Sequence, residues 1–415
     1  MKKTIWIINQ YSITPEYPAS TRHYELAKYL AKDFRVRLFG CNFIHHNKKY
    51  RFHSYTISKE EKMEGFIFQW VGANSYKGNG KLRSLNMLLF SFLLLIIGLC
   101  KRDKPDVIIG SSPPLFTAFS SLLIAKLRRT SFVLEVRDLW PDSLVQINGV
   151  PESKRIVKIM RWMEQTLYHH ADCIIALTNG IHSRLIEKGV SKNKVYFLPN
   201  GIDMETIIIN IDTRNAQRDL LRGQLQYKAD DFVFVYAGSH GPANDLYQII
   251  DAAEQLKGEN NIKFLLIGSG PEREKLLTAV DERKLSDKVT LLPSVPKEKI
   301  NDYLTIADAF IICLKNIPLF KDALPNKLFD YILHDKPIIS TVSGEIEQVL
   351  TTYKIGMYGS LTEEGKNNLV NVMKYVANNN SNCKPSQGKH IIQEHFNREK
   401  QADQLAKRLK TIMAK

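Results

Sequence analysis

Short runs of apolar, often β-branched residues alternate with amphipathic stretches along the 415-residue chain. Runs such as FVFVYAG and IKFLLIGSG are apolar at nearly every position, as expected of strands that helices cover on both faces. Strands that alternate with helices indicate βαβ units, a parallel sheet and an α/β fold. The pattern predicts strands at 4–9, 34–40, 66–71, 106–110, 131–136, 172–176, 194–198, 232–237, 262–267, 288–292, 308–313 and 337–340, and helices at 20–32, 84–101, 115–128, 152–169, 179–188, 243–257, 271–284, 297–305, 325–334 and 362–377.

The alternation breaks once, because residues 206–231 are largely polar and lack strand spacing. A new strand at Phe232 then restarts the pattern. We therefore predict two Rossmann-like, doubly wound domains, residues 1–200 and 201–396, whose carboxyl strand ends face a central cleft. The amphipathic residues 397–415 predict a terminal helix that packs back toward the first domain.

The composition, 44% hydrophobic and 24% charged, is that of an ordinary globular protein and excludes a disordered chain. The start of the chain has two lysines before a four-residue apolar run, which predicts a strand rather than a signal peptide. The five cysteines form no CxxC pair. We expect them to be reduced core thiols of a cytoplasmic protein, and we expect no metal site.

The net charge of +15 is confined to one half of the chain. Residues 1–200 hold 30 basic and 15 acidic residues, whereas residues 201–415 hold 28 of each. A one-sided positive field indicates an anionic partner, which could be nucleic acid, an acidic membrane surface or a phosphorylated substrate. No zinc finger, RNP-like motif or lysine-rich tail is found, which argues against nucleic acid.

Residues 85–100 form an apolar run in the same half, with basic flanks on both sides. Sixteen helical residues reach roughly 24 Å, short of the ~30 Å hydrocarbon core of a bilayer, so a spanning helix is disfavoured. Two interpretations stay open, a helix buried against the sheet and an interfacial helix on an anionic membrane. The flanking basic residues are Lys81, Arg83, Lys101, Arg102 and Lys104.

Two glycine-containing loops follow strands of the second domain and end in a proline, at Pro242 and Pro271. Glycines let the backbone approach a ligand, and a helix that begins at the proline would direct free N–H groups at an anion. Ordinary strand-to-helix turns produce the same pattern, and neither loop is a GxGxxG fingerprint. The predicted donor-binding residues of these loops are Gly238, Ser239, Gly241, Gly268 and Gly270.

A third segment places two carboxylates, Asp322 and Asp330, eight residues apart around a predicted helix start at Pro325. One carboxylate could hold sugar hydroxyls and the other those of a ribose, while the helix start, with Leu324 and Asn326, accepts a diphosphate. Lys327 would neutralise that diphosphate. A surface helix with solvated charges is the alternative.

These motifs together resemble the retaining glycosyltransferases of family 4, which have the GT-B fold. The segment from Asp322 to Asp330, followed by HDKP, stands where the family has Glu-x7-Glu and Gly-x-Pro, and LPNGID, YAGSHG and IADAFIICL agree with it. In the first domain, INQYSITPEYPASTRHYELAKYL and FVLEVRDLWPDSL are similar to the branch that builds bacterial surface polysaccharides such as O-antigen and capsule.

The resemblance implies a role for each matching residue. Asp322 would contact the donor sugar and Asp330 the ribose, while Arg137 and Asp138 would lie at the sugar's edge of the cleft. The family's first loop, beside diphosphate and acceptor, is Ala19, Ser20, Thr21 and Arg22 here. The basic pair that many members carry after the glycine loop at 238–241 is absent, so Lys327 and Arg22 are the candidates for the missing positive charge.

The resemblance also implies the reaction. A sugar, which could be an amino or deoxy sugar, would pass with retention and without metal or cofactor from a nucleotide sugar, with UDP expected as nucleotide. The acceptor would be a polyprenyl-diphosphate-linked saccharide at the inner face of the cytoplasmic membrane, where the protein would be peripheral. Two rivals stay open, a GT-B-fold sugar-nucleotide epimerase and a catalytically inactive, membrane-associated assembly partner.

Overall fold

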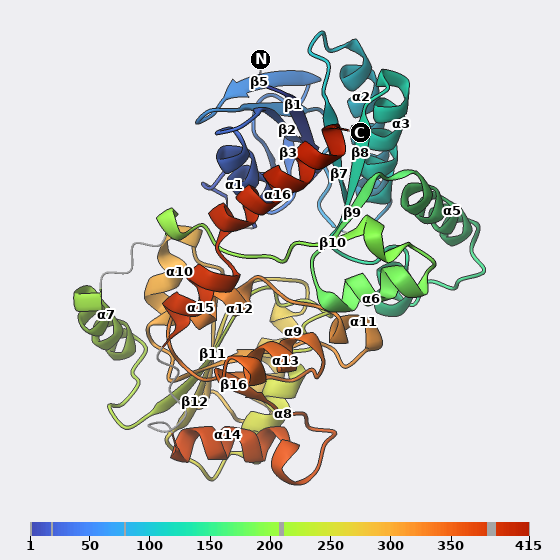
Figure 1. Ribbon diagram of the computed structural model, residues 1–415. Coiled ribbons are helices and arrows are strands. Elements are labelled where there is room, and N and C mark those ends of the chain that lie inside the picture. The colour runs from blue at the N-terminus through green and yellow to red at the C-terminus, as the bar shows by residue number, and fades with distance from the viewer. Residues whose placement is uncertain (1, 18–19, 79, 207–210, 380–386, 415) are drawn as a thin grey trace. The chain divides into compact units, whose positions relative to one another are not determined.

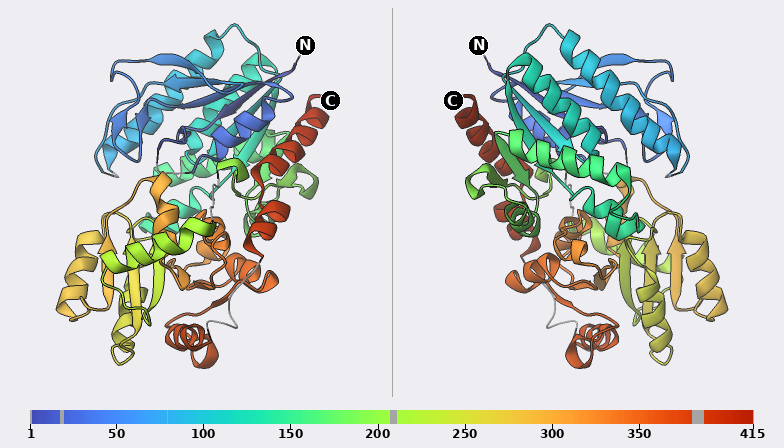
Figure 2. Two further views of the ribbon diagram at one scale, coloured as in Figure 1. Left: turned by 90° about the vertical axis from the view of Figure 1, so that its left-hand side faces the viewer. Right: turned by 90° about the vertical axis from the view of Figure 1, so that its right-hand side faces the viewer.

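The computed structural model describes residues 2–17, 20–78, 80–206, 211–379 and 387–414. The chain divides into two compact units. Unit 1 comprises Met1–Asp203 together with Asn397–Lys415, and unit 2 comprises Met204–Phe396. Figures 1 and 2 show the elements of each unit, coloured along the chain.

Unit 1 is built on an eight-stranded sheet in the order β10-β9-β8-β7-β1-β2-β6-β5. All neighbouring strands are parallel except β5, which is antiparallel to β6. The strand order reverses between β1 and β7, and the loops that leave their carboxyl ends diverge there. The strands are β1 (Thr4–Ile8), β2 (Arg35–Cys41), β5 (Ser58–Lys62), β6 (Ile67–Val71), β7 (Val107–Ser112), β8 (Ser131–Val136), β9 (Cys173–Ala176) and β10 (Val195–Phe197), and β3 (Phe43–Ile44) and β4 (Lys49–Tyr50) form a separate pair.

The sequence pattern located every long parallel strand of unit 1 and missed β5. The sequence of β5, SKEEK, is almost entirely charged and has no apolar period. It forms a strand because it lies at the sheet edge, where exposed charged side chains are tolerated and prevent edge-to-edge pairing. The helices of unit 1 are α1 (Arg22–Leu30), α2 (Lys81–Cys100), α3 (Leu115–Arg128), α4 (Asp142–Asn148), α5 (Arg155–His170), α6 (Asn179–Glu187) and α16 (Arg398–Met413), with a short 3₁₀ turn η1 (Lys192–Lys194).

The C-terminal helix α16 packs against α1. The Arg398 guanidinium donates to the Glu25 carboxylate at 2.9 Å, and Lys410 pairs with Asp33 at 2.7 Å. Because Arg398 and Glu25 are buried, this pair fixes the start of α16 on the first helix of the chain.

Helix α2 contains the apolar segment 85–100. Within the described part of the chain it is the one helix long and apolar enough to cross a membrane by length and composition, with a mean hydropathy of 2.0 over its most apolar window. A third of that window, 33%, is buried inside unit 1. One side of α2 thus lies in the interior, and the other side is exposed.

Unit 2 has a six-stranded, fully parallel sheet in the order β13-β12-β11-β14-β15-β16. The order reverses between β11 and β14, which makes their carboxyl ends the switch point of this sheet. The elements are η2 (Met204–Thr206), α7 (Ile211–Gln224), β11 (Phe232–Ala237), α8 (Tyr247–Gln255), β12 (Ile262–Ile267), α9 (Arg273–Glu282), β13 (Val289–Leu292), α10 (Lys297–Leu304), β14 (Ala309–Ile312), α11 (Pro318–Lys321), α12 (Lys327–Ile332), β15 (Ile338–Ser340), α13 (Glu345–Thr352), β16 (Gly356–Tyr358), η3 (Gly365–Asn367), α14 (Leu369–Asn378) and α15 (Gly388–His395).

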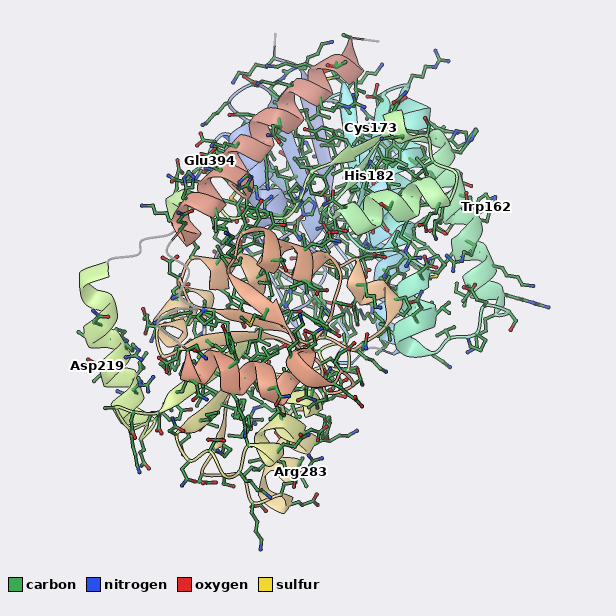
Figure 3. All side chains as sticks on the ribbon, turned by 60° about the horizontal axis from the view of Figure 1, so that its bottom comes forward. Trp162, Cys173, His182, Asp219, Arg283 and Glu394 are labelled. Atoms are coloured by element: carbon green, nitrogen blue, oxygen red, sulfur yellow. The ribbon has the colours of Figure 1, made fainter. Side chains whose placement is uncertain are left out.

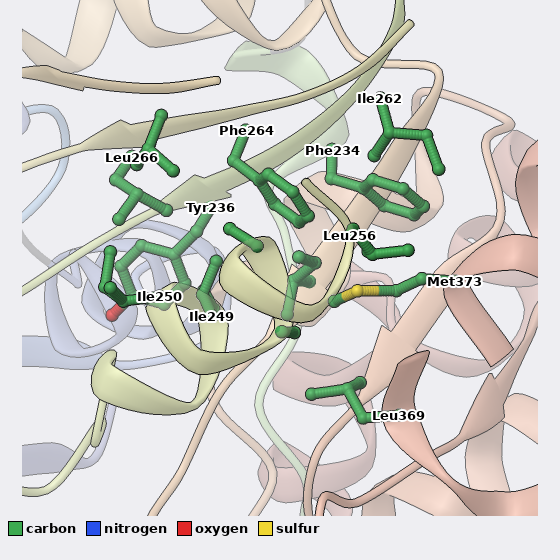
Figure 4. Close-up of a cluster of buried hydrophobic side chains, with 14 of the residues drawn as sticks. Phe234, Tyr236, Ile249, Ile250, Leu256, Ile262, Phe264, Leu266, Leu369 and Met373 are labelled. Atoms are coloured by element: carbon green, nitrogen blue, oxygen red, sulfur yellow. The ribbon is translucent and has the colours of Figure 1, made fainter. Parts of the chain in front are cut away.

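A buried apolar cluster holds the helices of unit 2 to the sheet (Figure 4). Phe234 of β11 stacks on Phe264 of β12 with 5.5 Å between ring centroids. Ile249 of α8 and Met373 of α14 belong to the same cluster. This packing fixes the end of β11, from which the first glycine loop departs.

The cysteines follow the expectation in part. Cys41, Cys173 and Cys313 are buried free thiols. The expectation is wrong for Cys100, which is exposed because it is the last residue of α2 and lies on its outward side. Cys383 lies outside the described residues.

Candidate functional site

The two glycine loops of unit 2 pack backbone to backbone at the switch point. The Gly238 N–H donates to the Ile267 carbonyl and the His240 N–H to the Ser269 carbonyl, both at 2.9 Å. A side chain at Gly268 would place its Cβ 1.8 Å from the Gly238 oxygen. Glycine is therefore required at 268 for the two loops to approach each other.

The first loop does not lead directly into a helix, so the predicted helix start at Pro242 is wrong. Helix α8 begins at Tyr247, after a turn in which the Asn244 N–H donates to the Gly241 carbonyl. Asp245 has a left-handed φ of 47°, which interrupts any helix before it. The second loop leads into a helix, although α9 begins at Arg273, two residues after the predicted start at Pro271.

His240 lies between the two glycine loops and is fully buried. Neither ring nitrogen of His240 has a hydrogen-bond partner in the described part of the chain. Burial lowers the pKa of His240 to about 4, and the nearby charges of Arg273 and Lys327 act in the same direction. The loop thus contains a neutral histidine with an unused N–H donor, a polar group that buried sites rarely leave unpaired.

Lys327, the first residue of α12, reaches the first glycine loop from the segment that follows β14. Its Nζ lies 3.9 Å from the centre of the Tyr236 ring and 3.4 Å from the Asn244 Oδ1. A Cβ built on Gly238 would be 2.8 Å from this Nζ. Burial lowers the pKa of Lys327 to about 7. Among the described residues no carboxylate forms an ion pair with Lys327, and its ammonium group contacts the tyrosine ring and an amide oxygen.

The acidic motif brackets the start of α12 as the spacing predicts, although the helix is shorter than predicted. Helix α12 begins at Lys327 rather than Pro325, and Asp330 lies in its first turn. Asp322 caps the preceding short helix α11, which the sequence pattern missed. Both carboxylates are partly exposed. Leu324 is buried, Pro325 is partly exposed and Asn326 is exposed.

Tyr331 fixes α12 to the end of β11. Its hydroxyl oxygen accepts the Ala237 N–H at 2.8 Å, and its ring stacks on Phe310 of β14 at 4.2 Å. Tyr331 therefore holds the acidic segment against the strand that carries the first glycine loop.

Asp335 stands where the resemblance leads us to expect glycine, and it adopts the backbone that glycine would supply. Its φ is 50°, in the left-handed region that commonly ends a helix. Its Oδ1 accepts the Gly388 N–H at 2.7 Å, which ties the start of α15 to this turn. The departure from the family pattern is accommodated locally.

Unit 1 brings Arg137 and Asp138 to the carboxyl end of β8, beside its own switch point. The Arg137 guanidinium donates to the Ser111 hydroxyl and the Pro113 carbonyl, both at 2.9 Å. Asp138 accepts the Ser143 hydroxyl at 2.8 Å, and burial raises the pKa of the Asp138 carboxyl. Both side chains are partly exposed, as a sugar-contacting pair would require.

Arg22 lies in the interior of unit 1. Its Nε donates to Glu135 at 2.9 Å, and its two terminal nitrogens donate to the carbonyls of Pro199 at 2.6 Å and Leu198 at 3.1 Å. Only 2% of the residue is exposed. With its donors engaged in this way, Arg22 holds segments of unit 1 together.

His23 and Glu135 complete this buried network and were missed by the sequence analysis. The Asn9 amide donates to His23 Nδ1 at 3.0 Å, which leaves His23 Nε2 to donate to Glu135 at 2.6 Å. Burial opposes ionisation of Glu135, but His23 and Arg22 outweigh it and hold the Glu135 pKa well below its usual range. The one acidic residue in the apolar run FVLEV was the available signal.

The first loop of unit 1 is described only in part. Ala19 lies outside the described residues, and Ser20 is exposed. Thr21 is buried and donates its hydroxyl to Glu25. Across the described residues, no three His, Cys, Asp or Glu side chains gather closely enough to hold a metal ion.

Comparison with known proteins identifies the chain at this point. Residues 19–201 match the family described as "Glycosyl transferase 4-like domain", and residues 217–390 match "Glycosyl transferases group 1". The chain belongs to the family 4 glycosyltransferases. Among curated proteins it is 27% identical over 230 residues to WcaI of Escherichia coli K12, which is named as a colanic acid biosynthesis glycosyl transferase. That match covers 55% of each chain, so the alignment spans about half the length of this relative.

Solved structures confirm the fold of this glycosyltransferase as GT-B. Sucrose-phosphate synthase of Thermosynechococcus elongatus matches with a TM-score of 0.75 at 17% identity, covering 100% of both chains. HepE of Anabaena in complex with UDP matches with a TM-score of 0.69 at 14% identity, covering 99% of this chain and 100% of that one. Further structures of HepE contain UDP with glucose, and UDP-glucose.

Proposed function

We propose that this glycosyltransferase moves a sugar, with retention, from a nucleotide sugar to a polyprenyl-diphosphate-linked saccharide during synthesis of a surface polysaccharide. The observation that carries the proposal is the close approach of the Lys327 ammonium group to the Gly238 loop at the switch point of unit 2. An ammonium without a carboxylate partner, beside glycine backbone and an unpartnered histidine, suits a diphosphate. The complexes of HepE with UDP and UDP-glucose favour UDP as the nucleotide.

In the proposed reaction the bond between the anomeric carbon and the diphosphate oxygen breaks while the acceptor hydroxyl bonds to the same face of that carbon. The acceptor proton passes to the departing diphosphate oxygen, so no separate general base is required. Lys327 stabilises the negative charge that develops on the diphosphate. Asp330 would hold the ribose, and Asp322 would hold the donor sugar. No metal or cofactor enters this scheme.

The acceptor part of the proposal rests on unit 1. Its half of the chain carries the entire positive excess, and its helix α2 exposes an apolar side. A lipid-linked diphosphate is both anionic and membrane-bound, which suits these two properties. The enzyme would then act as a peripheral protein at the inner face of the cytoplasmic membrane.

The test has two stages. The melting temperature of the protein is first measured with UDP-, GDP- and dTDP-sugars, because a true donor binds the native state and raises it. The donor that stabilises the protein is then incubated with membranes that contain lipid-linked saccharide, and transfer is followed by mass increase of the acceptor. Interconversion of the sugar nucleotide without acceptor would reveal an epimerase, and binding without any turnover would reveal an inactive partner.

A further inference from the structure

Exposed apolar side chains are concentrated on three helices of unit 1. Sixteen large apolar side chains are exposed in the described part of the chain, and ten of them lie on α2, α3 and α5. Soluble monomers rarely gather so many on one surface without a partner. We call this set the apolar face of unit 1: Leu82, Leu85, Leu88, Phe92, Ile96 and Leu99 of α2, Leu127 of α3, and Ile156, Ile159 and Trp162 of α5.

The three helices lie side by side, so these side chains form one surface. Helix α2 packs on α3, and α3 packs on α5 (Figures 1 and 2). The contact with α2 is close, since a Cβ on Gly98 would be 2.6 Å from the Ile124 side chain. On the other side of α3, the Phe119 and Trp162 rings lie 5.4 Å apart. Figure 3 shows Trp162 on the outer side of α5.

Helix α2 is apolar on its exposed side as well as on its buried side. Its buried side contains Phe90 and Leu94 and also two polar residues, Asn86 and Ser91. The Asn86 carbonyl accepts the Gln10 amide at 2.7 Å, and the Ser91 hydroxyl lies 3.3 Å from that of Thr117. Leu88, Phe92 and Ile96 are among the exposed side chains of its outer side. A surface helix normally buries its apolar stripe and exposes its polar one. The exposed stripe of α2 therefore suits a medium less polar than water.

Exposed charge around the apolar face is mostly positive. Helices α2 and α3 contain no aspartate or glutamate. The single acid of α5, Glu164, is buried and bonded to Tyr168 and Lys188. Two exposed acids near these helices are engaged in ion pairs: Glu152 pairs with Arg161, and Glu60 pairs with Lys101. Exposed basic residues border the face at Lys81, Arg102, Lys104, Lys126, Arg129, Lys154, Arg155 and Lys158.

We propose that the apolar face of unit 1 is a docking surface for an anionic lipid bilayer, with Phe92 and Trp162 entering the interface and the basic border meeting the headgroups. Apolar side chains in the acyl boundary, with lysine and arginine at headgroup level, are the arrangement by which helices lie in a membrane interface. This surface includes the basic flanks of α2 and adds exposed residues of α3 and α5. It rests on the proposed function only in that a lipid-linked acceptor requires the enzyme at a membrane.

A second copy of the chain fits this surface less well. A symmetric dimer built on the apolar face would bring two basic borders together, which costs free energy without a counter-charge. A membrane-spanning α2 would have to give up the hydrogen bond between Asn86 and Gln10 and its packing on α3. The bilayer surface satisfies both the outer apolar side chains and the positive border.

Tryptophan fluorescence tests the orientation directly. Of the four tryptophans, Trp6 and Trp70 are fully buried and Trp140 is partly buried, whereas Trp162 is 59% exposed. Phosphatidylcholine vesicles that contain phosphatidylglycerol should shift the emission to shorter wavelength, and neutral phosphatidylcholine vesicles should shift it less. The Trp162→Phe variant should lose most of the shift while it still binds. An equal shift in the variant would overturn the orientation.

Co-sedimentation with the same vesicles tests the surface. Phe92→Gln combined with Trp162→Gln should weaken binding about tenfold or more, because two apolar side chains no longer leave water. The control pair Leu220→Gln and Tyr375→Gln changes exposed apolar residues of unit 2 and should bind as the unchanged protein does. Added salt should weaken binding in both.

Other outcomes would overturn the inference and leave the proposed function intact. Equal binding by the two variant pairs, or no binding to anionic vesicles at low salt, would refute the docking surface. Retention that only detergent releases would indicate a spanning α2, and a dimer lost in the Phe92 and Trp162 variant without vesicle binding would indicate a second copy. Stabilisation by UDP, measured on every variant, reports the donor site separately. If no nucleotide stabilises any variant, the proposed function fails even where vesicles bind.

Discussion

The ammonium group of Lys327 lies 3.9 Å from the centre of the Tyr236 ring, beside the backbone of Gly238. The Tyr236 hydroxyl donates to the Ser239 carbonyl at 2.9 Å, so the ring is held to the same loop that the lysine approaches. The ring face attracts the cation, but burial is the larger effect and lowers the pKa of Lys327 to about 7. An anion at this loop would restore the charge of the lysine.

Loss of Lys327 should impair turnover rather than folding. Lys327→Ala should lower kcat by about 100-fold, as removal of a charge-stabilising donor typically does, and Lys327→Arg should recover part of it. The melting temperature should stay near that of the unchanged protein, because the lysine has no buried carboxylate to leave unpaired. Lys374→Ala, which removes a surface lysine of α14 paired with Glu259, is the control. Near-normal kcat in folded Lys327→Ala would contradict the role.

The pKa of Lys327 predicts a pH dependence of opposite sign for activity and for stability. Activity that needs the ammonium, followed as kcat/KM for the donor, should fall as pH rises through about 7. His240, with a pKa of about 4, stays neutral across this range and adds no second pH-dependent change in kcat/KM. The unfolded lysine titrates near 10.4, so the unliganded protein should gain stability as pH rises from about 7 to that value. An alkaline limb that persists unchanged in Lys327→Arg would show that another group titrates.

The sequence pattern predicted the parallel strands except β16, because a strand buried on both faces leaves a strong local signal. The proline signal placed the start of α12 within two residues but failed at Pro242. The sequence pattern failed where the structure depends on contacts that are distant in sequence. Helix α8 starts late because Asp245 adopts a left-handed turn, and SKEEK forms a strand because β6 offers it an edge. The burial of Arg22 depends on Glu135 and on carbonyls more than 170 residues away, which no local pattern reveals.

Gly268 should tolerate no side chain. In Gly268→Ala the new Cβ would lie 1.8 Å from the Gly238 oxygen, and the backbone φ of 156° is one that only glycine adopts without strain. The two loops would have to separate, so we expect the free energy of unfolding to fall by about 3 kcal/mol. We expect donor binding to weaken by a similar free energy, about 3 kcal/mol. Gly258→Ala, where a Cβ meets nothing within 4 Å, is the matched control. Chemical denaturation and nucleotide-induced thermal shifts measure the two effects, and equal behaviour of the two variants would contradict the packing.

Asp330 should determine donor affinity. Asp330→Ala should raise the donor KM and lower kcat/KM by tens-fold, on the order of 2 kcal/mol for a lost charged hydrogen bond to the ribose. Glu282→Ala, which removes an exposed acid at the end of α9, should leave both constants unchanged. A folded Asp330→Ala protein with normal donor KM and kcat would remove Asp330 from the donor site.

Substitution of Arg22 or Glu135 should lower the stability of the protein more than it lowers kcat. Arg22→Ala leaves the Glu135 carboxylate buried with hydrogen bonds from His23 and Ser111, and removing the charged partner of a buried pair in this way costs about 3 kcal/mol or more. Because the Glu135 pKa is held well below its usual range, the network stabilises the protein fully above about pH 4.5 and loses its effect as pH falls further.

Acid unfolding separates this structural role of Arg22 from a catalytic one. In Glu135→Gln the acid-dependent part of the stability should disappear, so its unfolding free energy should change less between neutral and acid pH than that of the unchanged protein. Arg22→Ala should show a lowered melting temperature, and at a temperature where it remains folded its kcat should exceed that of Lys327→Ala by tens-fold. If instead Arg22→Ala melts normally and its kcat falls as far as that of Lys327→Ala, Arg22 leaves Glu135 when the donor binds. The diphosphate charge would then be neutralised from unit 1.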